Sequence, residues 1–207
     1  MSILRRDKES LKRKVAREAA ILLYTGQEKE YRQAKIKAAE NLGVKILPSN
    51  REIAEELDGL AKELEGKERE KRLIEMRKTA LQIMKVLKAF NPKLVGSVWR
   101  GTANRKSDID ILIFHDMPKR IVTILEKAGF SIRRTEWRTT EKKGEKKSSF
   151  HLFLEHSGYE IEVVVKPLEV SEIVEKCEIY GDEITGLSIE ELEEVLRRNP
   201  LQRFLPE

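Results

Sequence analysis

The chain has 207 residues, of which 40% are hydrophobic and 37% are charged. This composition excludes a disordered protein and is sufficient for one large hydrophobic core or two smaller ones. No hydrophobic run approaches membrane-spanning length and the amino terminus lacks the hydrophobic stretch of a signal peptide, so we expect no membrane partner. The single cysteine, Cys177, excludes an intrachain disulfide framework and is typical of a reducing compartment, so we expect a cytoplasmic protein.

Charge is distributed unevenly along the chain. Residues 1–90 hold 22 basic and 15 acidic residues, residues 91–150 hold 14 and 7, and residues 151–207 hold 5 and 14, so the net charges are +7, +7 and −9. A basic first three quarters would attract a polyanion such as RNA or a nucleotide. A solvated surface of ion-paired helices is the alternative. The abundance of lysine, arginine and glutamate also resembles the proteins of hyperthermophiles.

The first ninety residues predict helices throughout. Hydrophobic residues at helical spacing, glycines that end helices, and a capping box formed by Ser49 and Glu52 define four of them. We expect these helices at residues 7–24, 28–42, 49–66 and 68–90, the last one ended by Asn91 and Pro92. We expect residues 1–67 to form a helical N-terminal region and residues 68–207 to form the second domain.

Beyond Pro92 the pattern alternates between strands and helices. We expect strands at residues 93–96, 107–114, 131–139, 150–156 and 159–166. We expect helices or helical turns at residues 97–102, 118–128, 170–176 and 188–198. The polar stretch at residues 139–149 predicts a hairpin tip and contains Lys142, Lys143, Lys146 and Lys147. The sequence therefore predicts a domain of strands and helices with a helical N-terminal extension.

The most informative segment runs from Gly96 to Asp110. A small, hydroxyl-bearing turn at Gly96 and Ser97 is followed by two aspartates, Asp108 and Asp110, which open a hydrophobic strand. Because alternate side chains of a strand share a face, both aspartates should point the same way, with Cα atoms about 7 Å apart. Two carboxylates at this spacing can bracket a pair of divalent ions about 4 Å apart. The segment predicts metal-assisted transfer of a phosphate-containing group.

A third acidic ligand is expected on the strand at residues 159–166. Its hydrophobic residues occupy one face, and Glu160 and Glu162 lie on the other. An acid among β-branched hydrophobic residues is costly to bury unless it has a role or a partner. Glu162, deepest in the hydrophobic run, is therefore the first candidate and Glu160 the second. An exposed strand face is the alternative for both.

The string formed by Gly96-Ser97, Arg100 to Thr102 and Ser107 to Asp110, followed by an acid on a later strand, resembles the polymerase-β-type nucleotidyltransferase superfamily. This group includes archaeal CCA-adding enzymes, poly(A) polymerases, aminoglycoside nucleotidyltransferases and minimal bacterial and archaeal nucleotidyltransferases. The resemblance covers residues 94–165, roughly a third of the chain. It implies an α+β fold with a small mixed sheet flanked by helices, preceded here by an all-helical region. That region resembles a segment of uncharacterised archaeal nucleotidyltransferases, which implies no activity.

The resemblance implies a role for each matching residue. Gly96 would let the backbone approach a triphosphate, and Ser97 would bind its β- or γ-phosphate. Asp108 and Asp110 would hold two Mg²⁺ ions. Glu162 would complete the second metal site and help to deprotonate the attacking hydroxyl, although the family more often has aspartate there.

Several other residues have two interpretations each. Arg100 would either reach the phosphates or brace the turn through an ion pair. Trp99 and Trp137 are expected in hydrophobic packing, with stacking on a base as the alternative. The histidines lack metal-ligand spacing with cysteine and are expected to be structural or exposed; they are His115, His151 and His156. The lysine-rich tip and a basic N-terminal cluster would either bind nucleic acid or be solvated; the cluster is Arg5, Arg6, Lys12, Arg13, Lys14 and Arg17.

The predicted function is Mg²⁺-dependent nucleotidyl transfer. An acceptor hydroxyl would attack the α-phosphorus of a nucleoside triphosphate, which we expect to be ATP, and pyrophosphate would leave. RNA, including tRNA, is the first expected acceptor, and a protein hydroxyl, as in antitoxin-like enzymes that modify a protein partner, is the second. The alternatives are a nucleotide- or RNA-binding module with little or no catalysis, and an interaction protein whose helical region binds a partner.

Overall fold

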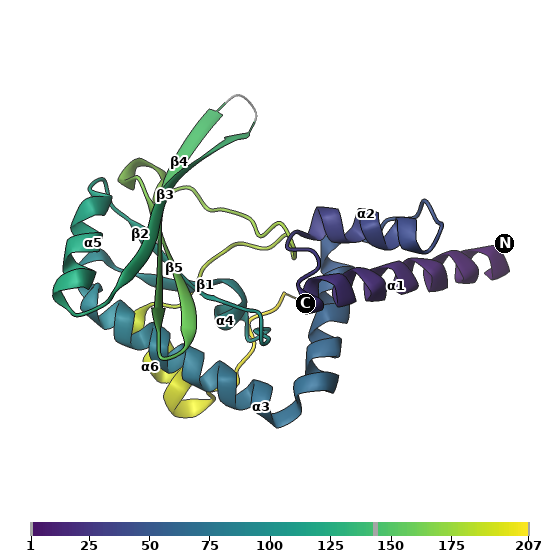
Figure 1. Ribbon diagram of the computed structural model, residues 1–207, viewed down its shortest axis with the longest axis horizontal. Helices are drawn as coiled ribbons and strands as arrows, with labels where there is room; N and C mark the ends of the chain where they lie inside the picture. Colours follow the sequence, from purple (N-terminus) through teal and green to yellow (C-terminus); the bar gives the residue numbers. More distant parts are fainter. Residues whose placement is uncertain (1, 143–144, 207) are drawn as a thin grey trace.

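The computed structural model describes residues 2–142 and 145–206, and for residues 2–7, 141, 142 and 145–147 it describes the backbone alone. The fold is α+β, as predicted, with a five-stranded mixed sheet flanked by helices and preceded by a helical region (Figure 1). The described helices are α1 (Ser2–Thr25), α2 (Tyr31–Asn41), α3 (Asn50–Val86), η1 (Lys88–Phe90), α4 (Gly96–Arg100), α5 (Pro118–Lys127), η2 (Leu168–Val170) and α6 (Ile189–Arg198). Within the described ranges, no helix combines the length and the hydrophobicity of a membrane span.

The sheet has the strand order β1-β2-β5-β4-β3, so its central pair joins strands that are distant in the sequence. The strands are β1 (Lys93–Val95), β2 (Ile109–Phe114), β3 (Ile132–Lys142), β4 (Glu145–His156) and β5 (Tyr159–Lys166). β2 and β5 are parallel, and the other neighbouring strands are antiparallel. The bounds of β5 agree with the predicted strand. β2 begins two residues later than predicted, so Asp108 belongs to the preceding loop.

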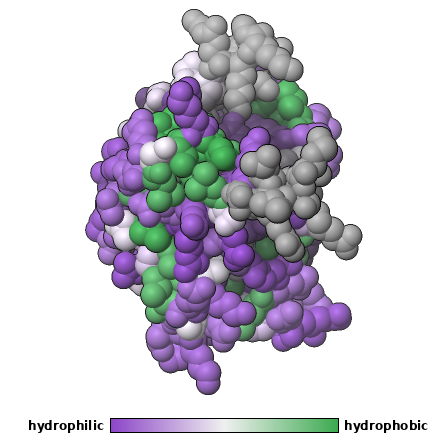
Figure 2. All heavy atoms as spheres, turned by 90° about the vertical axis from the view of Figure 1, so that its right-hand side faces the viewer, coloured by the Kyte–Doolittle hydropathy of each residue, from purple (hydrophilic) through white to green (hydrophobic). Residues whose placement is uncertain are grey.

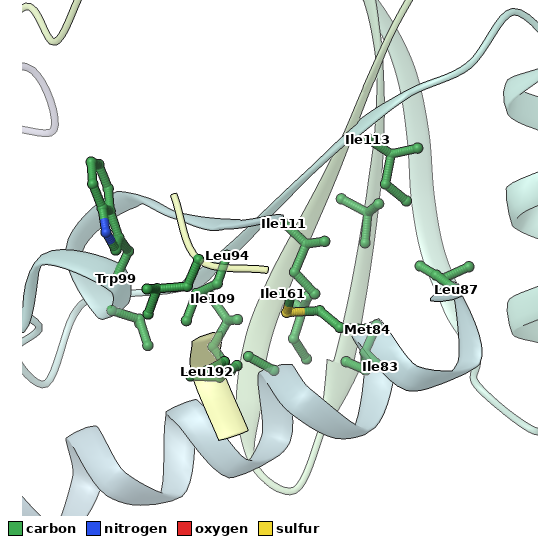
Figure 3. Packing of buried hydrophobic residues seen from close by; sticks show 14 of the residues in the cluster. Ile83, Met84, Leu87, Leu94, Trp99, Ile109, Ile111, Ile113, Ile161 and Leu192 are labelled. Carbon is green, nitrogen blue, oxygen red and sulfur yellow. The ribbon is translucent and has the colours of Figure 1, made fainter. Parts of the chain in front are cut away.

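One face of the sheet packs on helices and forms the main core. Alternate residues of β2 and β5, such as Ile111 and Val163, are fully buried on this face. Figure 3 shows Ile109, Ile111 and Ile113 facing Ile83 and Met84 of α3, with Leu192 of α6 beside them. The residues between them in the strands, including Asp110 and Glu162, therefore point to the opposite face, where the site lies.

The N-terminal helices form a bundle with a second core of their own. α1 packs on α2 and on the first half of α3, and small side chains such as Ala16, Ala19 and Ala38 allow close approach. α3 continues from this bundle into the main core, with a kink at Gly66, whose φ is 50°. The helix break therefore lies at the glycine expected to end one helix and precede the next. Figure 2 views this end of the molecule and shows a mostly hydrophilic surface interrupted by hydrophobic areas.

Two further predictions differ from the structure. The helix predicted at residues 170–176 is wrong: η2 ends at Val170, residues 171–175 form a turn and irregular backbone, and Lys176 then pairs with Glu183. Ile173 and Val174 are 46% and 61% exposed, so a helix there would lack the hydrophobic contacts that stabilise short helices. The hairpin tip predicted at residues 139–149 is shorter, because β3 and β4 extend into it; in Figure 1 this hairpin projects beyond the sheet.

Candidate metal centre

Three carboxylates meet where β2 begins to pair with β5. Asp110 and Glu162 are partners in the parallel register of these strands, and Asp108 lies two residues before Asp110. One carboxylate oxygen from each of the three lies within 4.8 Å of the others. Among the described residues this is the group of acids, histidines and cysteine that meets the geometry of a metal site. Glu160, the second candidate from the sequence, is exposed and does not belong to this group.

A closed turn positions Asp108. The side-chain oxygen of Asn104 accepts a hydrogen bond from the Lys106 amide at 2.8 Å, and the Ser107 hydroxyl oxygen accepts one from the Asn104 amide at 3.0 Å. Arg69 of α3 donates to the carbonyls of Thr102 and Ala103 at 2.8 and 2.7 Å. Helix α3 therefore holds the loop that presents Asp108.

Gly96 makes room for the Asp110 carboxylate. Val95, the residue before Gly96, pairs with Asp110 between β1 and β2. Gly96 itself has a φ of 71°. A Cβ atom at Gly96 would lie 2.8 Å from Cγ of Asp110 and would overlap one of its oxygens. The absence of a side chain at Gly96 thus leaves room for the Asp110 carboxylate.

Burial and mutual repulsion disfavour the charged forms of the two aspartates. Burial raises the pKa of Asp108, and the charges of Glu162 and Glu160 raise it further. Burial also raises the pKa of Asp110 well above its ordinary value, together with the charges of Asp108 and Glu162. A divalent cation among these oxygens would relieve the repulsion. The donor set, three carboxylates, suits a hard cation such as Mg²⁺.

Glu162 has two cationic or donor partners that the sequence did not suggest. Its Oε1 atom lies 2.6 Å from Nδ1 of His151 and 3.1 Å from Nη1 of Arg138. His151 is 7% exposed. Its contact with Glu162 could not be found from spacing, because it depends on the register of β4 against β5.

Ser97 and Arg100 lie in α4, directly after β1. Ser97 is half-buried, and its carbonyl accepts a hydrogen bond from the Thr102 amide at 2.9 Å. Arg100 forms the ion pair that the sequence offered as its second interpretation: its guanidinium contacts both carboxylate oxygens of Asp182 at 2.7 and 3.0 Å and lies over the rings of Trp99 and Tyr180. The Arg100 side chain therefore braces the turn. Its guanidinium is paired with Asp182 and is not directed at Asp108, Asp110 and Glu162.

Arg77 of α3 binds the C-terminal end of α4. It is fully buried, and its guanidinium donates to the carbonyls of Val98 and Trp99 and to those of Pro200 and Gln202 in the C-terminal segment. Burial lowers its pKa to about 10. A cation at the C-terminal end of a helix is also favoured by the helix dipole. Arg77 of α3 therefore ties the C-terminal end of α4 to the C-terminal segment of the chain.

The basic N-terminal cluster is largely ion-paired where its side chains are described. Lys12 pairs with Glu52 at 2.8 Å, Arg13 with Glu56 at 2.9 Å, and Arg17 with Glu63 at 2.6 Å. The side chains of Arg5, Arg6, Lys142, Lys143, Lys146 and Lys147 lie outside the described residues. These ion pairs favour the solvated, ion-paired helix surface for this part of the cluster.

The two tryptophans behave differently. Trp99 is 4% exposed and stacks on Phe204, as expected for a packed residue. The packing predicted for Trp137 is wrong, since it is 63% exposed and contacts the edge of Phe150 at the root of the projecting hairpin. Trp137 lies on the same face of the sheet as the main core. However, β3 is the edge strand, and in Figure 1 the described helices do not cover the projecting end of β3 and β4.

Comparison with known proteins finds one matching family model and distant similarity to solved structures. A family model described as a domain of unknown function (DUF4269) matches residues 77–175, which include all three carboxylates. No curated protein matches the sequence. Similar solved structures include a cytoplasmic RNA terminal U-transferase, with 16% identity over 56% of this chain and 34% of that chain, and a chain of the GLD-2/RNP-8 complex, with 18% identity over 52% and 39%. Both have a TM-score of 0.31, and this chain spans less than half the length of either.

Proposed function

We propose that this protein is a metal-dependent nucleotidyltransferase, which moves a nucleoside monophosphate from a nucleoside triphosphate to an acceptor hydroxyl and releases pyrophosphate. The observation that carries the proposal is the meeting of Asp108, Asp110 and Glu162, with oxygens within 4.8 Å, beside the turn at Gly96 and Ser97. The same residues form the string that resembles polymerase-β-type nucleotidyltransferases. ATP is the first nucleotide to test.

Each residue has a role in this reaction. Asp108, Asp110 and Glu162 would hold two Mg²⁺ ions, which neutralise phosphate charge when they are bound. The amide and hydroxyl of Ser97 would bind the triphosphate, which the adjacent Gly96 backbone can approach closely. Glu162 would also accept the proton of the attacking hydroxyl, the role that the resemblance implies for this acid.

RNA is the acceptor that the charge distribution favours. Residues 91–150, which contain the loop and most of the sheet, hold 14 basic and 7 acidic residues. Such an excess attracts a polyanion and predicts binding that weakens with salt. The ion pairs of Lys12, Arg13 and Arg17 reduce the support for the N-terminal helices as the RNA-binding surface. A protein hydroxyl is the second acceptor class.

The proposal is tested by transfer of label from each of four α-labelled nucleoside triphosphates into fractionated RNA and protein, with Mg²⁺ present. Wild-type protein should label one of these fractions. Asp108→Asn and Asp110→Asn should each abolish transfer, since the cations lose one of three carboxylate ligands and are held too weakly to compensate the phosphate charge.

Glu160→Gln is the matched control. Glu160 is on the same strand and the same face as Glu162, but it is exposed and outside the carboxylate group. It should retain most of the activity, whereas Glu162→Gln should lose it. A wild-type protein that binds nucleotide but labels neither fraction would support the binding-module alternative and contradict the proposal.

A further inference from the structure

Glu162 is held by a chain of side chains on the neighbouring strand. Its Oε1 atom lies 2.6 Å from Nδ1 of His151, and Nε2 of His151 lies 2.7 Å from the hydroxyl oxygen of Ser149. The side chains of His151 and Glu162 are 9% and 14% exposed. An ionised carboxylate can only accept, so Nδ1 of His151 donates this hydrogen bond.

The orientation of the His151 ring is fixed from two further directions. Ser149 lies two residues earlier on β4 and therefore points to the same face of the sheet. The ring of Phe153, two residues later, stacks on His151 with centroids 6.4 Å apart and planes 17° apart. Ser149, His151 and Phe153 thus fix the direction in which Nδ1 points.

Arg138 cannot provide the same restraint. Its side chain is 46% exposed, and it shares its guanidinium between Glu162 at 3.1 Å and Glu136 at 2.6 Å. An exposed arginine with two acidic partners can balance the charge of Glu162, but it fixes its direction less than a buried ring does. Arg138 can therefore balance the charge of Glu162, whereas His151 is the residue that can fix the orientation of its carboxylate.

The other two carboxylates are also restrained by their surroundings, by different means. Asp110 packs against Gly96, and Asp108 follows the closed turn at Asn104 and Ser107. Glutamate has one more rotatable bond than aspartate, so Glu162 needs an additional contact to keep its oxygens in one place. Hydrogen bonds to ligating carboxylates commonly serve this purpose in metal sites.

We propose that His151, braced by Ser149, is a positioning residue that holds Glu162 in the orientation for divalent-metal binding. The inference rests on the proposed metal-dependent function and concerns the same site. The opposite possibility is that His151 and the metal compete for Glu162. The two differ in sign: loss of the His151 contact weakens metal binding if the residue positions Glu162, and strengthens it if the residue competes.

The test measures the dissociation constant of Mn²⁺ for the full-length protein by titration calorimetry, with Mn²⁺ alone as the probe. His151→Phe keeps the ring and removes both nitrogens, and His151→Asn keeps an N–H donor near the place of Nδ1. His156→Phe is the matched control, because His156 is also on β4 but contacts Gln82 at 3.3 Å. Thermal melting of the metal-free variants shows whether each one folds.

His151→Phe should weaken Mn²⁺ binding about tenfold or more. His151→Asn should restore most of the affinity, Ser149→Ala should weaken it by a smaller factor, and His156→Phe should leave it unchanged. In the transfer assay His151→Phe should lower kcat, with the KM of the nucleotide near the wild-type value. If His151 only stabilised the fold, its loss would not lower kcat while leaving KM unchanged. His151→Asn would also not restore Mn²⁺ affinity.

Equal or tighter Mn²⁺ binding by folded His151→Phe would overturn the positioning role and leave the proposed function intact. Absence of Mn²⁺ binding by the wild-type protein would overturn both. If His151→Phe does not fold, Ser149→Ala decides the matter: weaker binding than wild type supports the positioning role, and equal binding overturns it.

Discussion

Because Gly96 has no side chain, the carboxylate of Asp110 can occupy its observed position. A Cβ atom at Gly96 would collide with Asp110, and the backbone has a φ of 71°, which other residues adopt at a cost. Gly96→Ala should therefore lose about 1–3 kcal/mol of stability from backbone strain. It should also displace Asp110, and a displacement of 1 Å can lower a rate about 100-fold. Thermal unfolding and label transfer measure the two effects.

Gly129→Ala separates these effects. Gly129 has a φ of 88°, and a Cβ atom there would meet nothing within 4 Å. This variant should show a similar loss of stability with near-normal transfer activity. Equal activities in Gly96→Ala and Gly129→Ala would show that the Asp110 carboxylate does not depend on the space at Gly96.

Asp110 should destabilise the metal-free protein at neutral pH. Burial and the neighbouring carboxylates raise its pKa in the folded state above the value in the unfolded chain. The stability associated with such a group is present below the unfolded pKa and is lost as the pH rises through the folded pKa. Asp110→Asn removes this titration, so in EDTA it should melt at a higher temperature than wild type at pH 8, with a smaller difference at pH 5.

Saturating Mn²⁺ should reverse this order at pH 8, because the cation stabilises the wild-type carboxylates and has lost a ligand in the variant. Equal melting temperatures of wild type and Asp110→Asn at both pH values in EDTA would contradict the repulsion inferred for this site.

At the scale of the elements, α3 connects the N-terminal bundle to the loop at residues 102–108, which presents Asp108. Arg69 binds the carbonyls of Thr102 and Ala103 and pairs with Asp58 at 2.5 Å. Asp58 keeps a second partner in Arg203 at 2.6 Å, so Arg69→Ala should cost about 1–3 kcal/mol, mainly because the two carbonyls lose their charged donor. Arg69→Ala should therefore reduce stability and also weaken Mn²⁺ binding, since the loop before Asp108 loses its support.

Lys71→Ala is the control for Arg69→Ala, because Lys71 lies on the same helix and forms an exposed pair with Glu68. Its effect on stability and Mn²⁺ binding should be small. Normal Mn²⁺ binding by Arg69→Ala would mean that the loop keeps its shape without α3. The N-terminal bundle would then be free to serve another purpose, such as binding a partner.

At the scale of the whole molecule, local patterns predicted the elements that depend on local chemistry. Strand β5 was predicted with its observed bounds because hydrophobic and polar residues alternate along it, and α6 follows the capping box at Ser188. The helix predicted at residues 170–176 failed because its hydrophobic residues have no surface to pack on. Local propensity is overruled wherever such contacts decide the structure.

The site could be predicted only in part. Asp108 and Asp110 are recognisable because they lie two residues apart before a hydrophobic strand. The pairing of Asp110 with Glu162 depends on which strands are neighbours, and the contact of His151 with Glu162 depends on a second register. The ion pair of Arg100 with Asp182 spans 82 residues. Such contacts require the fold, because nothing in the local sequence links their members.

The central claim, nucleotidyl transfer at these three carboxylates, is tested most directly by comparing α-labelled with γ-labelled ATP in the presence of the acceptor fraction. The account predicts that wild-type protein transfers the α-label to the acceptor and releases the γ-label as pyrophosphate, and that Asp110→Asn does neither. Transfer of the γ-label to the acceptor, or transfer of the α-label that survives in Asp110→Asn, would contradict it.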